Sequence, residues 1–356
     1  MSIKTKVRGR GAQANPKNRF EKLSLEDFKE NELDSFVLEE DEVKIPTQFF
    51  VDESKTVIAK NDSYDVGFEY SFNPYRGCEH GCIYCYARPS HEFLGFSSGI
   101  DFETKIMIKK DAPKLLEAEF RKKSYKPDFI MFSGNTDCYQ PAERKLKLTR
   151  ETLKVCLKYR NPVTIITKNE LIQRDLDIIK QMAELNLVSV TLSITTLDKN
   201  LARKMEPRTS LSERRLQTIE KFAQNDIPVG VNIAPVIPGL NDEEIPAILK
   251  EASLRGAISA GHIMLRLPYA VKDLFLQWLK KEFPDRESKI VNKILEMRDG
   301  KLNDPEFGTR FTGKGELAGT IHSLFDLSCK KYGLNKKRII LRKDLFCRES
   351  DQLEMF

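Results

Sequence analysis

Three cysteines in one short stretch are the residues of this chain best suited to chemistry. Cys78, Cys82 and Cys85 have the spacing Cys-x3-Cys-x2-Cys, and an aromatic residue, Tyr84, directly precedes the third. Three thiolates this close in sequence can ligate three irons of a cubic [4Fe–4S] cluster and leave the fourth iron without a protein ligand. A small molecule can then chelate that iron. The spacing predicts a [4Fe–4S] cluster that is open to a second cofactor.

Two other interpretations of these cysteines stay open. Zinc usually takes four protein ligands, and His80 or His91 would supply the fourth. A disulfide with one spare thiol is the other alternative. The remaining cysteines are scattered, as in a reduced cytosolic protein, and the sequence around Cys156 and Cys329 predicts that both are buried apolar groups in helices.

Composition and charge limit the class of protein. The chain has 356 residues with 40% hydrophobic content, enough for one large domain with additions or for two domains. Its net charge of +6 is concentrated in residues 1–19 and 330–348. Such basic ends either meet nucleic acid or form solvated surfaces. No apolar run approaches membrane-spanning length and no secretory signal is present, so we expect a cytoplasmic protein with no membrane partner.

The middle of the chain alternates between two hydrophobic patterns. Short β-branched runs, typical of buried strands, occupy residues 68–72, 128–132, 162–167, 187–194, 228–234 and 260–265. Amphipathic helical patterns lie between them, at residues 111–123, 144–160, 171–185, 211–225 and 241–254. Continuous hydrophobic strands separated by amphipathic helices indicate a parallel sheet covered by helices. Asn161, Asn186 and Asn225 each stand at a helix-to-strand turn that favours a left-handed residue.

We therefore predict an α/β fold, a partial (β/α)6 TIM-type barrel with additions at both ends. Residues 1–60 lack periodicity and are expected to form an extended segment that wraps the core, or one that is partly disordered. The barrel should occupy residues 61–268. Residues 269–356 should form a helical extension, with helices at 271–283, 286–298 and 316–332.

Polar residues follow every predicted strand. In a parallel barrel the carboxyl ends of the strands meet at one mouth, where loops carry the reactive groups. The polar residues at these positions are Ser133, Asn135 and Asp137, then Lys168, Ser193, Arg208 and Asn232, and finally Arg266. Because the cysteines follow the first strand, all of these side chains should converge on one functional site.

The motifs of this site resemble those of the radical S-adenosylmethionine (SAM) superfamily. Tyr84 matches the residue that packs by the adenine, and Ser133–Asn135 takes the place of the loop that binds the SAM ammonium. Ile237 matches an adenine-contacting position after strand five, although Pro235 replaces a glycine there. Within the superfamily, residues 68–266 are similar to the group related to spore photoproduct lyase, often labelled DNA repair photolyase.

This resemblance implies two cofactors, a [4Fe–4S] cluster and SAM, and assigns residues to the parts of SAM. Asp137 suits the ammonium and Lys168 and Arg208 suit the carboxylate. Ser193 and Asn232 suit the ribose hydroxyl groups, and the turn at Ile237 suits the adenine. Each of these side chains has an alternative role, because Lys168 can instead pair with a helix carboxylate and Arg208 with Glu206.

Two residues are candidates for hydrogen transfer with the substrate. Tyr86 matches a tyrosine implicated in hydrogen relay in the lyase group. The hydrogen-donating cysteine of that group lies three residues before the aspartate, where this chain has Gly134. Cys138, one residue after Asp137, faces either the cavity or the core. Repair of thymine dimers is therefore only weakly implied.

The sequence thus predicts a radical SAM enzyme that cleaves SAM reductively to a 5′-deoxyadenosyl radical, which abstracts hydrogen from a substrate. Nucleic acid is the first choice of substrate, with a flavodoxin- or ferredoxin-type electron donor as a further partner. The alternatives are a zinc-bearing nucleic-acid binding module and a non-catalytic iron–sulfur electron carrier. Residues 308–315 nearly match a phosphate-binding loop, but Gly315 replaces its Ser/Thr and no strand precedes it, so we set it aside.

Overall fold

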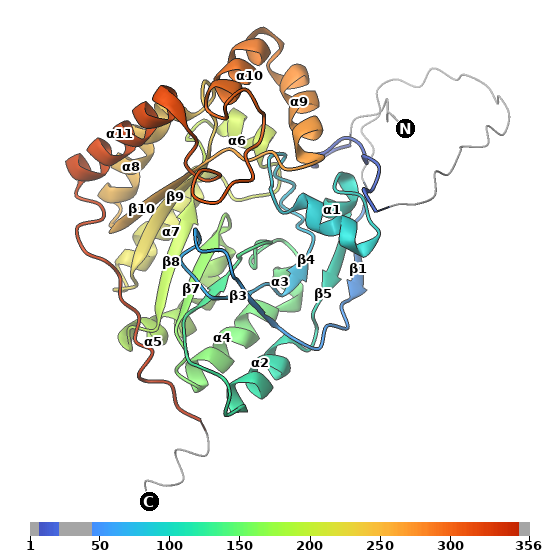
Figure 1. The fold of residues 1–356 in the computed structure, drawn as a ribbon. Coiled ribbons are helices and arrows are strands. Elements are labelled where there is room, and N and C mark those ends of the chain that lie inside the picture. The colour runs from blue at the N-terminus through green and yellow to red at the C-terminus, as the bar shows by residue number, and fades with distance from the viewer. Residues whose placement is uncertain (1–6, 21–44, 349–356) are drawn as a thin grey trace, which may run out of the picture.

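A seven-stranded sheet forms the centre of the protein, as a computed structural model of residues 7–20 and 45–348 shows (Figure 1). The strand order is β10-β9-β8-β7-β6-β3-β2, and every pair is parallel except β2 with β3. The strands are β2 (Ile58–Lys60), β3 (Tyr70–Phe72), β6 (Ile130–Phe132), β7 (Val163–Thr167), β8 (Val188–Ser193), β9 (Val229–Val236) and β10 (Ser259–Met264). Because β10 and β2 remain as edges, the sheet is open, which confirms the predicted partial barrel with six parallel strands.

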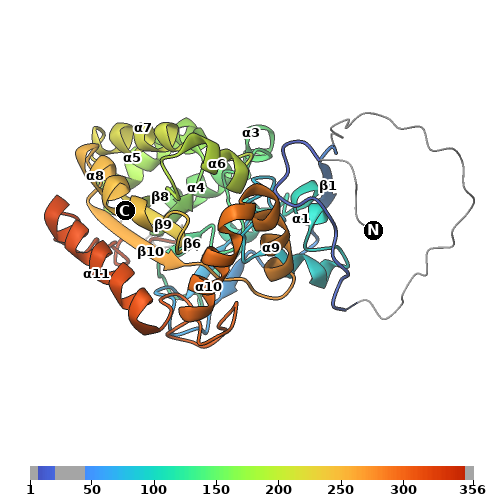
Figure 2. The same ribbon diagram turned by 90° about the horizontal axis from the view of Figure 1, so that it is seen from above.

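Helices connect the parallel strands and cover one face of the sheet. They are α2 (Ala112–Arg121), α3 (Glu143–Leu146), α4 (Leu148–Lys158), α5 (Leu176–Glu184), α6 (Lys199–Met205), α7 (Ser212–Ala223) and α8 (Ile245–Leu254). Figure 2 shows α4, α5, α7 and α8 in an arc along the sheet, with α9 and α10 on the other side of the strands. The buried faces of α2, α4, α5, α7 and α8 and of the strands form the main hydrophobic core, which includes Cys156 as predicted.

A second, three-stranded sheet was not predicted. Strands β1 (Gln48–Val51), β5 (Lys105–Ile108) and β4 (Tyr75–Arg76) pair in the order β1-β5-β4, and helix α1 (Ile100–Thr104) precedes β5. All four residues of β1 are exposed, so its sequence has no buried face for a pattern to reveal. The predicted segment 1–60 thus contributes a strand to each sheet, β1 and β2, although residues 1–6 and 21–44 lie outside the described residues.

The three predicted C-terminal helices are present as α9 (Val271–Glu282), α10 (Glu287–Glu296) and α11 (Gly315–Tyr332). Helix α11 packs against α8 and buries Phe325 and Cys329 in the main core. Helices α9 and α10 share a second core with the cysteine loop, which includes Ile83. Among the described residues, no helix has the length and apolar character that crossing a bilayer requires.

Only one of the three predicted left-handed turn residues is correct. Asn186 has φ of 55°, but Arg160 and Asp226 take that conformation in place of Asn161 and Asn225. Asn161 is buried, and its side chain accepts a hydrogen bond from Tyr125. The side-chain amide of Asn161 thus links this turn to the segment before β6, where it donates to the carbonyl of Asp128 at 3.1 Å.

The N-terminal arm, residues 7–14, packs directly beneath the cysteine loop. The backbone amides of Gly11 and Ala12 donate to the Glu103 carboxylate at 3.0 and 2.7 Å. The Arg10 guanidinium donates to the carbonyl of Glu103 at 2.7 Å. A Cβ atom on Gly11 would lie 1.8 Å from the carbonyl oxygen of Gly81. Only glycine allows the arm to approach the loop this closely.

We expect Gly11→Ala to displace the arm, because its methyl group overlaps the backbone of Gly81. Overpacking of this kind costs about 1–3 kcal/mol. Tryptic cleavage after Arg10, which is buried, should accelerate by roughly five-fold or more, as measured by peptide mass spectrometry. Gly67→Ala is the matched control, since nothing lies within 4 Å of its added Cβ. Equal cleavage rates in the two variants would contradict this account of the arm.

Candidate functional site

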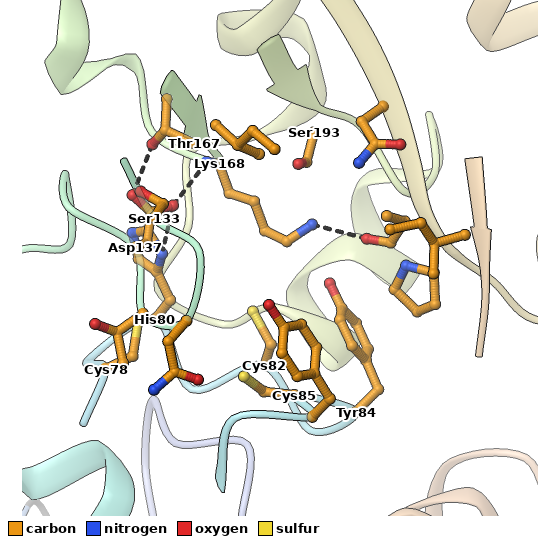
Figure 3. A pocket seen from close by; sticks show the side chains of 18 of the residues that line it. Cys78, His80, Cys82, Tyr84, Cys85, Ser133, Asp137, Thr167, Lys168 and Ser193 are labelled. Atoms are coloured by element: carbon orange, nitrogen blue, oxygen red, sulfur yellow. Dashed lines mark hydrogen bonds and ion pairs between the residues drawn. The ribbon is translucent and has the colours of Figure 1, made fainter. Parts of the chain in front are cut away.

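One pocket at the carboxyl ends of the strands contains all three motif cysteines. Cys78, Cys82 and Cys85 line it together with residues that lie in or just after β6, β7, β8, β9 and β10. Figure 3 shows the cysteines along one side of the pocket and the Lys168 side chain extending across it. All three thiols are free; Cys78 and Cys82 are buried, and Cys85 is partly buried. The convergence of the strand ends thus places three thiols around one cavity.

The cysteine loop has no regular secondary structure, so neighbouring elements satisfy its backbone. The amide of Cys78 donates to the carbonyl of Phe102 at 2.9 Å, and that of Ile83 donates to Met205 at 3.1 Å. The Arg88 guanidinium donates to the carbonyl of Cys82 at 2.9 Å and pairs with Glu103 at 2.5 Å. Both members of this ion pair are fully buried. These contacts fix the shape of the loop on the side away from the pocket and leave the thiols on the pocket side.

Burial raises the pKa of each of the three thiols above its usual value. The carboxylate of Asp137 adds to this effect at Cys78, and that of Glu206 adds to it at Cys82. The metal-free pocket therefore favours protonated thiols. Ligation of iron requires thiolates, so it must displace these protons.

Asp137 joins three of the loops that form the pocket. Its carboxylate accepts hydrogen bonds from the Thr167 hydroxyl and from the backbone amide of Lys168, both at 2.8 Å. Nδ1 of His80 lies 3.4 Å from the same carboxylate. Although burial alone would raise the pKa of Asp137, His80 and the backbone amides of Lys168 and Tyr139 lower it. The carboxylate is therefore ionised, and most of its hydrogen-bonding capacity is used within the protein.

Lys168 is paired within the protein as well. Its Nζ lies 3.4 Å from the Glu206 carboxylate, donates to the carbonyl of Ala234 at 3.0 Å, and lies over the Tyr84 ring. Glu206, which follows α6, also accepts from the Tyr84 hydroxyl and pairs with Arg215 of α7. Pairing with a carboxylate, the alternative role for Lys168, is thus what the structure shows.

The remaining predicted residues fall into two groups. The residues that line the same pocket as the cysteines are Tyr84, Tyr86, Ser133, Asn135, Asp137, Lys168, Ser193 and Asn232. Arg208, Ile237 and Cys138 do not line it. Arg208 pairs with Glu79 at 3.3 Å, and Ile237 is fully buried in the second core. The Cys138 thiol is fully buried in the main core, so we withdraw it as a candidate for catalysis.

The two histidines offered as zinc ligands have other surroundings. His80 contacts Asp137 through Nδ1 and Asn169 through Nε2, at 3.4 and 3.2 Å. The His91 ring packs against Phe96 and Phe102 and does not line the pocket. Within residues 7–20 and 45–348, no three His, Cys, Asp or Glu side chains converge on a single metal-ion position. The donor set that the pocket offers is three thiols.

Sequence reasoning missed Glu206 as a central residue and left Arg266 without a role. Glu206 was considered only as a partner of Arg208, whereas it pairs with Arg215 and Lys168. A signal for Arg215 did exist, because it lies among the apolar positions of α7 and is fully buried. Arg266 follows the sixth parallel strand, β10. Its position after a strand was the sequence signal that it belongs to the pocket, which it lines.

A family model described as the Radical SAM superfamily matches residues 72–252. This range is about half of the chain and contains the cysteine loop and strands β6 to β9. The chain belongs to the radical SAM superfamily. Its members use a [4Fe–4S] cluster and SAM, so both predicted cofactors are confirmed at the level of the family.

Several curated relatives are themselves uncharacterised. A protein of Mycobacterium tuberculosis is 34% identical over 224 residues, which are 62% of this chain and 66% of that protein. A protein of Methanocaldococcus jannaschii is 32% identical over 178 residues, or 50% of this chain and 64% of that protein. The match therefore spans just under two thirds of the length of either relative.

Solved structures of spore photoproduct lyase share the fold. One was solved with dinucleoside spore photoproduct, and it aligns with a TM-score of 0.58 over 80% of both chains at 16% identity. A double mutant with bound AdoMet and the same dinucleoside gives a TM-score of 0.59 over the same share of both chains. At this identity the similarity shows the fold and leaves the reaction to other evidence.

The Glu206 network predicts a pH dependence of stability. Burial alone would raise the pKa of Glu206, but Arg215 and Lys168 outweigh it and hold the pKa well below its usual range. Ionised Glu206 therefore stabilises the fold above its unfolded pKa of about 4.3, and this contribution is lost as the pH falls toward the folded value. We expect Glu206→Gln to lower the free energy of unfolding by about 3–5 kcal/mol at pH 7 and to flatten its decline below pH 5.

Urea unfolding of the metal-free protein at a series of pH values measures this effect. Glu251→Gln is the control, because this carboxylate pairs with Arg255 on the surface of α8. Its loss should change the free energy of unfolding by about 1 kcal/mol or less. Parallel pH curves for the wild type and Glu206→Gln would refute the proposed contribution of the network.

Proposed function

We propose that the protein is a radical SAM enzyme whose cluster is ligated by Cys78, Cys82 and Cys85. The observation that carries this proposal is that three free thiols line one pocket at the mouth of the partial barrel. The chemistry of this donor set fits the cofactor, since three thiolates leave one iron of a cubic cluster open. When bound, the cluster and SAM supply a 5′-deoxyadenosyl radical that abstracts hydrogen from the substrate.

The residues that line the pocket would bind and orient SAM. Ser193, the last residue of β8, and Asn232, within β9, line the pocket and would contact the ribose hydroxyl groups. Tyr84 and Lys168 line the pocket next to each other, and the ion pair with Glu206 fixes the position of the Lys168 ammonium group. Asp137 keeps the loops after β6 and β7 together, and its negative charge lies near Ser133 and Asn135, where the SAM ammonium would bind.

Tyr86 is the residue we propose for hydrogen relay. Tyr86 is the residue after Cys85 in the sequence, and it lines the pocket. The residue is 47% exposed, and its hydroxyl donates to the carbonyl of Gly134 at 2.7 Å. A tyrosine hydroxyl has an ordinary pKa of about 10, so that of Tyr86 keeps its hydrogen at neutral pH. With the Cys138 thiol in the core, Tyr86 is the candidate that remains next to the reaction site.

Nucleic acid is the substrate we propose, with a lyase-type reaction. The support is the fold shared with spore photoproduct lyase, whose solved structures hold a dinucleoside spore photoproduct. The basic segment 330–348 adds positive charge that is suited to a phosphate backbone. A base within a duplex would have to be extruded from the stack to reach the pocket. A flavodoxin- or ferredoxin-type protein would supply the electron.

Replacement of all three motif cysteines by alanine should abolish both the cluster and SAM cleavage. We expect anaerobically purified wild type to contain iron and sulfide in nearly equal amounts and to form 5′-deoxyadenosine with SAM and dithionite. The triple variant should show neither, whereas Cys347→Ala, away from the pocket, should show both. Zinc without sulfide in the wild type would support the binding-module alternative. A cluster that forms without 5′-deoxyadenosine would support the electron carrier.

The proposed substrate class is tested by isotope transfer. With SAM, dithionite and an oligonucleotide of perdeuterated thymidine, we expect mass spectrometry to detect deuterium in the 5′-deoxyadenosine. The label can enter only if the radical abstracts hydrogen from the oligonucleotide. The triple cysteine variant shows the background. Formation of 5′-deoxyadenosine with no deuterium would contradict this substrate while leaving the class of enzyme intact.

A further inference from the structure

Arg266 is a cation of the pocket that lacks an anionic partner. It follows β10 and lines the same pocket as the three cysteines. No hydrogen bond or ion pair joins its guanidinium group to another residue of the described ranges, and its Nε is buried without a partner. Lys168 and Arg208, by contrast, pair with Glu206 and Glu79. Arg266 is partly buried, and withdrawing even part of a guanidinium group from water without a counter-ion is costly.

Two aromatic rings determine where this guanidinium group lies. Its carbon is 5.6 Å from the centroid of Tyr86 and 4.9 Å from that of Phe311. The backbone at Phe311 is itself fixed, because its carbonyl accepts from the amide of Met264 at 2.9 Å. Stacking on rings orients the planar group and leaves its N–H donors available. Arg266 is thus held in place without using its hydrogen-bonding capacity.

Neighbouring residues increase the positive charge around Arg266. Arg298, which is buried, donates to the carbonyls of Leu265 and Arg310 at 2.7 and 3.1 Å and therefore keeps its charge next to Arg266. Arg310 also lies close to Arg266, although its ion pair with Asp65 at 2.5 Å offsets part of its charge. Burial, and then the charge of Arg310, lower the pKa of Arg266, and Tyr86 and Asp65 offset part of this effect. Both effects disfavour the cation, and an anion bound at this place would relieve them.

We propose that Arg266 binds a phosphate group of the substrate, an inference that rests on the proposed function for the identity of the pocket. Arginine presents a planar fork of donors that matches two oxygens of a phosphate. Arg266, Phe311 and Arg310 lie outside residues 72–252, the range shared with the superfamily. Since SAM binding is common to the superfamily, residues beyond this range are better placed to select the substrate.

An exposed aromatic pair next to this site favours a nucleotide as the phosphate carrier. The rings of Tyr64 and Phe307 lie 5.2 Å apart and are 79% and 47% exposed. The Arg310 guanidinium lies over the Phe307 ring at 4.4 Å and connects the pair to the arginines. Bases stack on exposed aromatic rings of this kind, while arginines contact the phosphates beside them.

Binding to cluster-containing protein, purified without oxygen, tests the proposal without turnover. The probes are thymidine 5′-monophosphate and a single-stranded hexathymidylate, and thymidine is the uncharged comparison. Calorimetry measures the affinity of each. We expect Arg266→Gln to weaken binding of both phosphate probes by about ten- to hundred-fold and Arg266→Lys to weaken it less. Arg255→Gln, which removes a surface charge after α8, should bind as the wild type does. Circular dichroism establishes that each variant is folded.

The two probes distinguish a free nucleotide from a strand. A much larger loss for the hexathymidylate indicates a strand, and equal losses indicate a mononucleotide; both support Arg266 as the phosphate site. Unchanged affinity for both probes in Arg266→Gln overturns it. A loss of SAM affinity without a loss of phosphate affinity also overturns it, because Arg266 would then serve the SAM carboxylate. Because binding is measured without reductant, a protein that binds phosphate through Arg266 but forms no 5′-deoxyadenosine contradicts the proposed function alone.

Discussion

The buried ion pair between Glu103 and Arg88 is the interaction on which the site depends. The cysteine loop has no helix or strand of its own, so its shape must come from partners outside it. Arg88 reaches the carbonyl of Cys82, and Glu103 in turn holds Arg88 and the amides of Gly11 and Ala12. A single carboxylate thus couples the loop to the N-terminal arm. Breaking such a buried pair is expensive, because one charge is then left uncompensated.

The parallel sheet was predictable because its signal is local and repeated. Most strands are short runs rich in β-branched and apolar residues with at least alternate positions buried, as in Val163–Thr167, and the helices between them have an amphipathic period, as in Leu176–Glu184. The second sheet lacks both signals. Strand β1 is exposed throughout and pairs with β5, which lies far along the chain. Its formation depends on tertiary contacts that no local pattern encodes.

The candidate site was predictable in its positions and much less so in its pairings. The rule that polar residues gather at the carboxyl ends of parallel strands located Asp137, Lys168 and Asn232 in one pocket. Which charges neutralise one another depends on distances between loops, and the sequence does not contain these. Lys168 therefore reaches Glu206, and Arg208 reaches Glu79 in the cysteine loop. Whether a side chain faces the cavity or the core, as for Cys138, is equally a matter of packing.

The pairing pattern divides the pocket into two chemically different parts. Around the cysteines each charged group has a partner within the protein. Lys168 pairs with Glu206, and Asp137 contacts His80 and accepts a hydrogen bond from a backbone amide. Such a region is preorganised, since its groups need not move when a ligand arrives. At the end of β10 the charges do not balance, because Arg266 is stacked on rings and has no carboxylate. The first part suits cofactors that every member of the superfamily shares, and the second suits an anionic group that a particular substrate brings.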